Sequence, residues 1–384
     1  MIYLSLLLLL FILAVFDSCV QKQYFAFPRI IDSNNVNVNL RGIRNKIPIS
    51  FIFMFLWFIY ATTIMGLRGN FSTDYDHYSD WFYRINNMSK SEFWDCFGLK
   101  NVFSTYMETG YVVINKLVGS ICLNHVWLFV VCSIIICLPV FFLFTKCPKA
   151  WIAVLLWISI GPYLESFNTM RGAMAASILI FSLKYIEERK PIKYILIVLL
   201  ATLFHSISIL MLVAYFLPNI KPSKASILFI GVFAVVVSLC SEYLTIMFNS
   251  VFHIANDAEG ALLLLHRNKS SGASLIVPAM IELISLFVFW RAVKCNSIDI
   301  SDKRIRLIYN GNLIWFMFEL LTLITGYSVR FAMLFFCYPC VFISFVLSKY
   351  TKSIIPQLLI ILFAVAWYLV NTLVRYPEYY FAIR

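Results

Sequence analysis

Six charged or titratable side chains lie within or beside the long apolar runs of this chain. They are three arginines, two carboxylates and one histidine: Arg68, Arg171, Arg330, Asp74, Glu108 and His205. Charges next to membrane spans are costly and tend to line cavities. The planar guanidinium of arginine donates paired hydrogen bonds that match a diphosphate, and a carboxylate or an imidazole can take a proton from a hydroxyl. These residue types fit the transfer of a group away from a lipid diphosphate.

Each of these residues also has a structural interpretation. A single arginine at the end of a span often extends to lipid head groups, and this applies to Arg171 and Arg330. His205 can instead pack as a polar residue bonded to a carbonyl group. Glu282 and Glu319 fall within apolar runs, where a carboxylate has either a function or a protonated structural role. Both interpretations stay open at this point.

An aromatic cluster follows Asp74 in the stretch "DYDHYSDWFY". Tyr75, Tyr78 and Trp81 recur at helical spacing and are candidates for stacking on sugar rings. With Phe82 and Tyr83, the same rings also fit the aromatic belt of a membrane–water interface. Either way, the cluster lies beside the membrane.

The composition limits the elements that can position these residues. Of 384 residues, 61% are hydrophobic and 13% are charged, and apolar runs recur along the whole length. No soluble domain buries that much apolar surface, so the sequence predicts an all-α polytopic integral membrane protein. About 10–12 transmembrane helices are expected, including a re-entrant pair near 194–217. The other spans are predicted at 1–18, 47–66, 126–145, 150–164, 172–186, 225–241, 273–290, 307–326, 331–348 and 353–374.

The stretch 194–217 decides the orientation of everything that follows it. If it turns back near His205, the segments expected in the cytoplasm hold 19 lysines and arginines in 64 residues, against 11 in 111 outside. A single crossing would place the basic segment 291–306 outside. Because cytoplasmic loops are enriched in lysine and arginine, the counts predict the turn. Each arm of about twelve residues rises only about 18 Å, so the turn is expected below the outer surface, inside a protein-lined cavity.

The chain is predicted to form one transmembrane domain over 1–384. Its large extracytoplasmic loop, 67–125, carries the patterns R-x-x-x-x-T-D-Y and E-x-G, and 242–272 forms a second extracytoplasmic loop. The net charge of +12 is explained by this topology, so no nucleic-acid partner is expected. The ten scattered cysteines do not form a metal motif, and neither a metal nor another cofactor is predicted.

A series of short motifs resembles the EpsG family of bacterial exopolysaccharide proteins, which is related to the Wzy O-antigen and capsule polymerases. In order, they are "RGNFSTDYDHY", "METGYVVINKL", "NTMRGAMAASILIFSLKYIEERKPIKY", "LFHSISIL" and "SVRFAMLFFCYP". The matching positions are Arg68, Asp74, Tyr75, Glu108, Gly110, Arg171, Ala175, His205 and Arg330. One departure is Gly172, because such proteins often carry glutamine after the helix-start arginine.

The resemblance implies a polysaccharide polymerase with a GT-C-like architecture in the bacterial inner membrane, with an active site that faces the periplasm or cell exterior. Its partners would be polyprenyl-diphosphate-linked oligosaccharides, as donor and as acceptor, and the lipid bilayer. A chain-length regulator and a flippase of the same pathway are further candidates. Arg68, Arg171 and Arg330 would bind the diphosphate, while Asp74, Glu108 or His205 would activate the acceptor hydroxyl. Tyr75, Tyr78 and Trp81 would bind sugar.

Two alternative functions remain open. A membrane glycosyltransferase that adds one sugar from a polyprenyl-phosphate donor would use Asp74 and Asp76 as its acidic outer-loop motif, with or without a metal. A flippase for lipid-linked oligosaccharide would need alternating access and charges near the midplane or on both faces. The candidate residues gather on one predicted face, which favours the polymerase.

Overall fold

The computed structural model describes residues 2–19, 49–70, 72, 74–95, 107–240, 243, 272–322, 328–350, 352–375 and 381–382. Within these residues the regular secondary structure is helical, apart from an isolated β-bridge between Arg68 and Phe381. Most of the predicted loop 242–272 lies outside the described residues.

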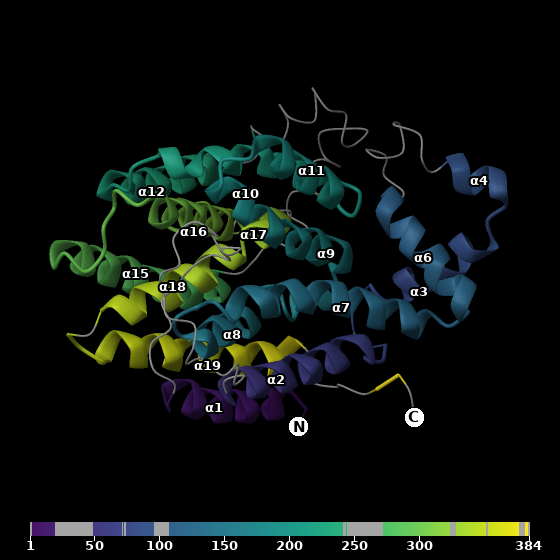
Figure 1. Cartoon of the computed structure of the whole chain (residues 1–384), viewed down its shortest axis with the longest axis horizontal. Coiled ribbons are helices and arrows are strands. Elements are labelled where there is room, and N and C mark those ends of the chain that lie inside the picture. Colours follow the sequence, from purple (N-terminus) through teal and green to yellow (C-terminus); the bar gives the residue numbers. More distant parts are fainter. Residues whose placement is uncertain are drawn as a thin grey trace, which may run out of the picture.

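Figure 1 shows long helices running roughly side by side in one body. The first half comprises α1 (Ile2–Cys19), α2 (Ile49–Gly66), α3 (Tyr75–Asn87), α4 (Lys90–Asp95), α6 (Thr109–Ile121), α7 (His125–Phe144), α8 (Ala150–Ser159), η1 (Glu165–Phe167), α9 (Met170–Leu179), η2 (Ile180–Ser182) and α10 (Leu183–Glu187). The second half comprises α11 (Pro191–Thr202), η3 (Ser206–Asn219), α12 (Lys224–Leu239), α15 (Gly272–Lys294), α16 (Lys303–Leu321), α17 (Ser328–Leu334), α18 (Cys337–Lys349) and α19 (Ile355–Arg375).

The outer surface of this body is apolar, as expected of a multi-pass membrane protein. Leu8, Phe229 and Leu362 are each more than half exposed, whereas the large rings of Trp57 and Trp157 are buried between helices. Among the described residues, the helical stretches His125–Phe144, Leu275–Lys294 and Ile355–Leu373 are long and apolar enough to span a bilayer, and α17 with α18 makes a fourth if the bent pair is one span. Shorter apolar helices occupy other predicted spans. The fold class predicted from the sequence is confirmed.

Two predicted spans are interrupted. The span predicted at 331–348 is divided into α17 and α18, which meet at an angle of 54°. Pro339 has no N–H, and its ring would clash with the carbonyl of Phe335 in a continuous helix, so the chain turns before α18 begins. The span predicted at 172–186 is likewise broken by the 3₁₀ turn η2.

The predicted turn near His205 is confirmed. Helix α11 and the 3₁₀ helix η3 pack against each other as a hairpin. The hydroxyl of Tyr194 donates to the carbonyl of Met211, and the rings of Tyr194 and Tyr215 lie 5.3 Å apart. Because residue 194 in the first arm pairs with 211 and 215 in the second, the chain reverses direction between them.

Contacts at the two ends of the body agree with this reversal. At one end, Arg304 forms an ion pair with Glu187, which joins two of the segments predicted to be cytoplasmic. At the other end, the amide of Ala382 donates to the carbonyl of Leu67 at 2.8 Å, which joins two of the segments predicted to be outside. We call this second end, which carries α3, α4 and α6 at the right of Figure 1, the polar end. Which end faces the cytoplasm stays a prediction.

Candidate active site

A close backbone contact at the polar end brings the E-x-G motif to the hairpin turn. The amide of Gly110, in the first turn of α6, donates to the carbonyl of Leu203, just after α11, at 2.8 Å. A Cβ atom at Gly110 would lie 2.8 Å from that carbonyl oxygen, so a larger residue would push the two elements apart. The glycine therefore allows Glu108, which precedes α6, to lie beside the residues of the turn.

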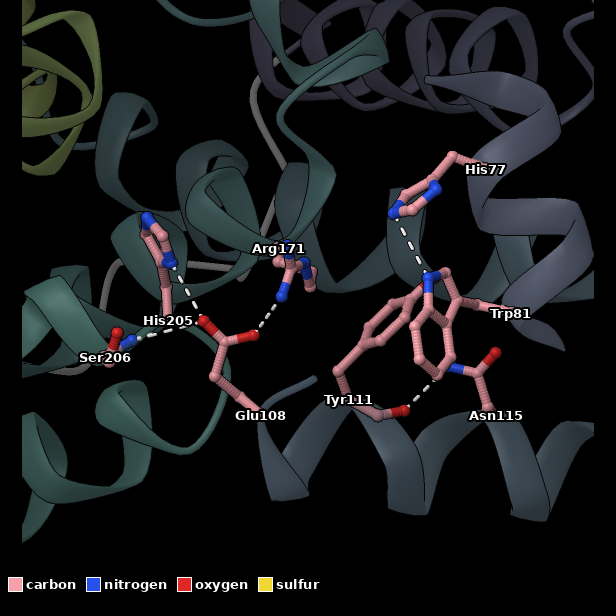
Figure 2. A network of polar contacts seen from close by, with 8 residues as sticks. All are labelled: His77, Trp81, Glu108, Tyr111, Asn115, Arg171, His205 and Ser206. Carbon is pink, nitrogen blue, oxygen red and sulfur yellow. Dashed lines mark hydrogen bonds and ion pairs between the residues drawn. The ribbon is translucent and has the colours of Figure 1, made fainter. Parts of the chain in front are cut away.

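The carboxylate of Glu108 joins three segments that are far apart in the sequence. One oxygen accepts from a terminal nitrogen of Arg171 in an ion pair. The other lies 3.1 Å from Nδ1 of His205 and accepts from the amide of Ser206 at 3.4 Å. Figure 2 shows the Glu108 side chain reaching between Arg171 and His205. Three of the six residues singled out from the sequence thus form one cluster, which we call the Glu108 cluster.

Glu108 is held in its ionised form. Its burial raises the pKa, but the hydrogen bond from His205 and the charge of Arg171 outweigh that effect, and together they lower the pKa of Glu108 to about 2. A carboxylate with this pKa is a weak base at neutral pH. Its place between Arg171 and His205 fits a residue that orients both side chains.

The second nitrogen of His205 is directed away from Glu108. Nε2 of His205 makes no hydrogen bond with any residue that the structure describes. The ring edge lies over Gly172, where a Cβ atom would be 3.3 Å from Cδ2 and 3.7 Å from Nε2. Gly172 therefore leaves space beside the nitrogen that is available to accept a proton.

Arg171 lies in the first turn of α9, between Glu108 and the aromatic helix α3. Its positive charge is close to Tyr78, whose pKa is raised by burial and partly lowered again by Arg171. The Arg171 side chain is 26% exposed, although its Nε is buried and has no partner among the described residues. The partly exposed side chain can therefore contact an anionic group in addition to Glu108.

Arg68 does not belong to the Glu108 cluster. Its side chain is fully buried, where it donates to the carbonyls of Met65 at 2.6 Å and Phe167 at 3.3 Å, and it lies 4.4 Å from the ring of Phe129. These contacts join the end of α2 to the segment before α9. They favour a structural role, and the prediction that Arg68 contacts a diphosphate remains without support.

The remaining charged candidates lie at the edges of the Glu108 cluster. Asp74 precedes α3 and is close enough to Tyr78 for its charge to raise the pKa of that phenol. Arg330 is an exposed residue of α17, one helical turn before Met333, whose sulfur lies near Thr169 and Gly172. Helix α17 packs against α9, so Arg330 lies on an element next to the cluster.

The predicted sugar-binding aromatics are in three different environments. Tyr78 is buried and packs against Tyr111, with ring centroids 5.8 Å apart, so its ring has no open face for stacking. Tyr75 is also buried, and its hydroxyl lies 3.0 Å from Nε2 of His125. Trp81 is half-buried, and its indole N–H donates to His77 at 3.1 Å, as Figure 2 shows.

His125, which was not predicted from the sequence, organises the other side of α3. Its Nε2 lies 3.0 Å from the hydroxyl of Tyr75, and its Nδ1 lies 3.1 Å from the hydroxyl of Tyr83. The sequence feature that could have identified His125 is its position between Asn124, which caps α7, and the apolar run of that helix. Among the residues that the structure describes, no three His, Cys, Asp or Glu side chains are grouped as metal ligands would be.

The helical body with an apolar surface and a polar, partly buried cluster at one end defines a multi-pass membrane protein with a candidate group-transfer site. The model of the EpsG family matches residues 46–383, so the chain belongs to the EpsG family. Membership indicates a membrane protein of the polysaccharide polymerase or glycosyltransferase type. No curated protein and no solved structure matches the chain.

Proposed function

We propose that this protein is a polysaccharide polymerase that joins polyprenyl-diphosphate-linked oligosaccharide repeat units on the outer face of the bacterial cytoplasmic membrane. The observation that carries this proposal is the Glu108 cluster, in which one carboxylate orients both a histidine and an arginine. The EpsG family match supports the class of reaction. The polymer is an O-antigen, a capsule or an exopolysaccharide.

His205 acts as the general base. Its Nε2 takes the proton from a hydroxyl of the acceptor repeat unit, and the resulting oxygen nucleophile bonds to the anomeric carbon of the donor glycan. Glu108 accepts the Nδ1–H bond of His205, which fixes the ring and stabilises the imidazolium that forms. Asp74 and Glu108, the other candidates for the base, then have supporting roles.

Arg171 stabilises the leaving group. The bond between the anomeric carbon and the diphosphate oxygen breaks, and its electron pair leaves with the polyprenyl diphosphate. The guanidinium of Arg171, positioned by Glu108, donates hydrogen bonds to the developing negative charge. Arg330 adds a second positive charge from α17, which packs against α9.

Reconstitution tests this proposal. Purified protein in lipid vesicles is supplied with lipid-linked repeat units, and the glycan length and the released polyprenyl diphosphate are measured. We expect His205→Ala and Arg171→Lys each to reduce the rate of linkage formation by about 100-fold or more, since one loses the base and the other loses the paired donors. Arg304→Lys is the matched control, because Arg304 forms a comparable carboxylate ion pair with Glu187 at the opposite end of the body.

The products of this reconstitution assay also distinguish a polymerase from a single-addition transferase and from a flippase. A polymerase yields glycans of many repeats, whereas a single-addition transferase yields one added sugar. A flippase yields no new linkage and moves the lipid-linked unit across the membrane. Full activity of both His205→Ala and Arg171→Lys would contradict the proposed site.

A further inference from the structure

Two hollows lie on either side of Tyr83 on the surface of α3. The first has a volume of about 600 Å³ and lies between α3 and the start of α7, where Tyr75, Asn124 and His125 form part of its wall. The second has a volume of about 610 Å³ and is lined by Asp80, Tyr83, Arg84, Asn87, Met88 and Glu92. Tyr83 therefore borders both hollows.

Tyr83 is held in place as a partly exposed aromatic ring. Its hydroxyl lies 3.1 Å from Nδ1 of His125, while the other nitrogen of this imidazole lies 3.0 Å from the hydroxyl of Tyr75. The side chain is nevertheless 38% exposed. A partly exposed aromatic ring that is held by its hydroxyl is suited to packing against the apolar face of a sugar ring.

The connection between α3 and α4, which follows Tyr83 in the chain, is also fixed by local contacts. Glu92 accepts from the amide of Ser89 at 2.7 Å and from its hydroxyl at 2.8 Å, which forms a capping box at the start of α4. Lys116 donates to the carbonyls of Ile85 and Asn86 at the end of α3, where a positive charge is favourable. The second hollow is therefore preformed.

The polar groups around both hollows favour a neutral, hydroxyl-rich ligand. Asp80, Tyr83 and Asn87 follow one another at spacings of three and four residues, so they share one exposed face of α3. Carboxylates and amides accept and donate hydrogen bonds as sugar hydroxyls require. The described wall of the first hollow includes no lysine or arginine, and in the second hollow Arg84 is accompanied by the carboxylates of Asp80 and Glu92. Neither hollow therefore matches a diphosphate.

The opposite face of α3 carries Tyr78, which lies near Arg171. One helix thus separates the Glu108 cluster from the two hollows. We propose that Tyr83 and the hollows on both sides of it form a binding track for several consecutive sugars of a neutral oligosaccharide, outside the reaction centre. This inference rests on the proposed function for the identity of the ligand, which is the glycan that the protein extends.

The first experiment measures binding without turnover. The probe is a set of lipid-free fragments, several repeats long, cut from the polymer exported by cells that carry the protein, and it is titrated into the purified full chain in detergent. We expect Tyr83→Ala to raise the Kd by about 3- to 10-fold through loss of the ring, whereas Tyr83→Phe keeps the ring, loses only its hydrogen bond with His125, and is expected to raise the Kd by less. Asn87→Ala, on the exposed rim of the second hollow, is a further variant that leaves Tyr83 and its anchor intact, and it is expected to weaken binding.

The second experiment separates this track from the reaction centre. Tyr83→Ala is expected still to form linkages but to give shorter glycans, because the growing chain dissociates earlier. His205→Ala is expected to lose linkage formation while it retains fragment binding. One outcome would contradict only the binding track. In it, His205→Ala loses activity, but Tyr83→Ala and Asn87→Ala change neither fragment binding nor glycan length. Unchanged linkage formation in His205→Ala would instead count against the proposed function.

Discussion

The amide of Gly110 and the carbonyl of Leu203 are joined by a hydrogen bond of 2.8 Å, and this contact ties the start of α6 to the turn of the α11–η3 hairpin. Glu108 is two residues before this bond and His205 is two residues after it. The distance between the two side chains therefore depends on how closely two backbone segments approach.

Substitution of Gly110 tests this dependence. In Gly110→Ala, the new methyl group would lie 2.8 Å from the Leu203 oxygen, so α6 must shift away from the hairpin. We expect linkage formation to fall by about 10- to 100-fold, because small displacements of catalytic groups have large effects. The rate is measured in vesicles beside the thermal unfolding midpoint. Gly231→Ala is the control, since a Cβ atom there has no neighbour within 4 Å; equal rates in both variants would contradict the argument.

The ionised state of Glu108 predicts a pH-dependent contribution to stability. The pKa of Glu108 is lowered from 4.5 to about 2, so its stabilising effect is complete above pH 4.5 and is lost as the pH falls towards 2. We expect wild type to unfold at a higher temperature than Glu108→Gln at about pH 6, with the difference smaller at about pH 3. A difference that is constant over this range would show that the carboxylate charge does not stabilise the fold.

Arg68 is predicted to stabilise the protein without taking part in the reaction. Arg68→Met would leave the buried carbonyls of Met65 and Phe167 without this donor. We expect the free energy of unfolding to fall by about 1–3 kcal/mol, with little change in the rate per folded molecule. Arg291→Met, at an exposed position, is the matched control. If Arg68→Met keeps the wild-type stability but loses the reaction, this prediction is wrong and Arg68 is again a candidate for binding the diphosphate.

The hairpin predicts the sidedness of the second half of the chain. Single cysteines at Lys221 and Arg304, introduced into a cysteine-free variant, are expected to react only with a reagent that reaches the cytoplasm, because the basic segments face inwards. A cysteine at Asn87 on α3 is expected to react from outside. Reaction of Arg304→Cys from outside would reverse the assignment of the two ends.

Much of the helical architecture was predictable because span length and hydrophobicity follow from the physics of the bilayer. The turn near His205 was predictable from the distribution of charge. Only a reversal there places 291–306 on the same side of the membrane as the other basic segments. The break between α17 and α18 was not predicted, although Pro339 provides its local cause. Apolar composition alone does not distinguish a continuous span from a bent pair.

The site was only partly predictable. The residue types of Glu108, Arg171 and His205 indicated chemistry, but their contacts depend on chain segments separated by 63 and 97 residues. Arg68 has the same residue type as Arg171, and the sequence does not show that Arg68 is fully buried against protein carbonyls whereas Arg171 is partly exposed beside Glu108. His125 was missed because its two tyrosine partners become neighbours only when α3 folds against α7.

The long separations within the Glu108 cluster also determine when it forms during synthesis. Arg171 is made 63 residues after Glu108, and His205 is made 97 residues after it. At about 5–20 residues per second, the ribosome needs roughly 5–20 s to extend the chain from Glu108 to His205. Throughout that interval, Glu108 lacks the side chain that completes its hydrogen bonds. Its predicted place in a loop outside the membrane gives the carboxylate water as a temporary partner, so the nascent chain avoids burying an unpaired charge before the hairpin is inserted.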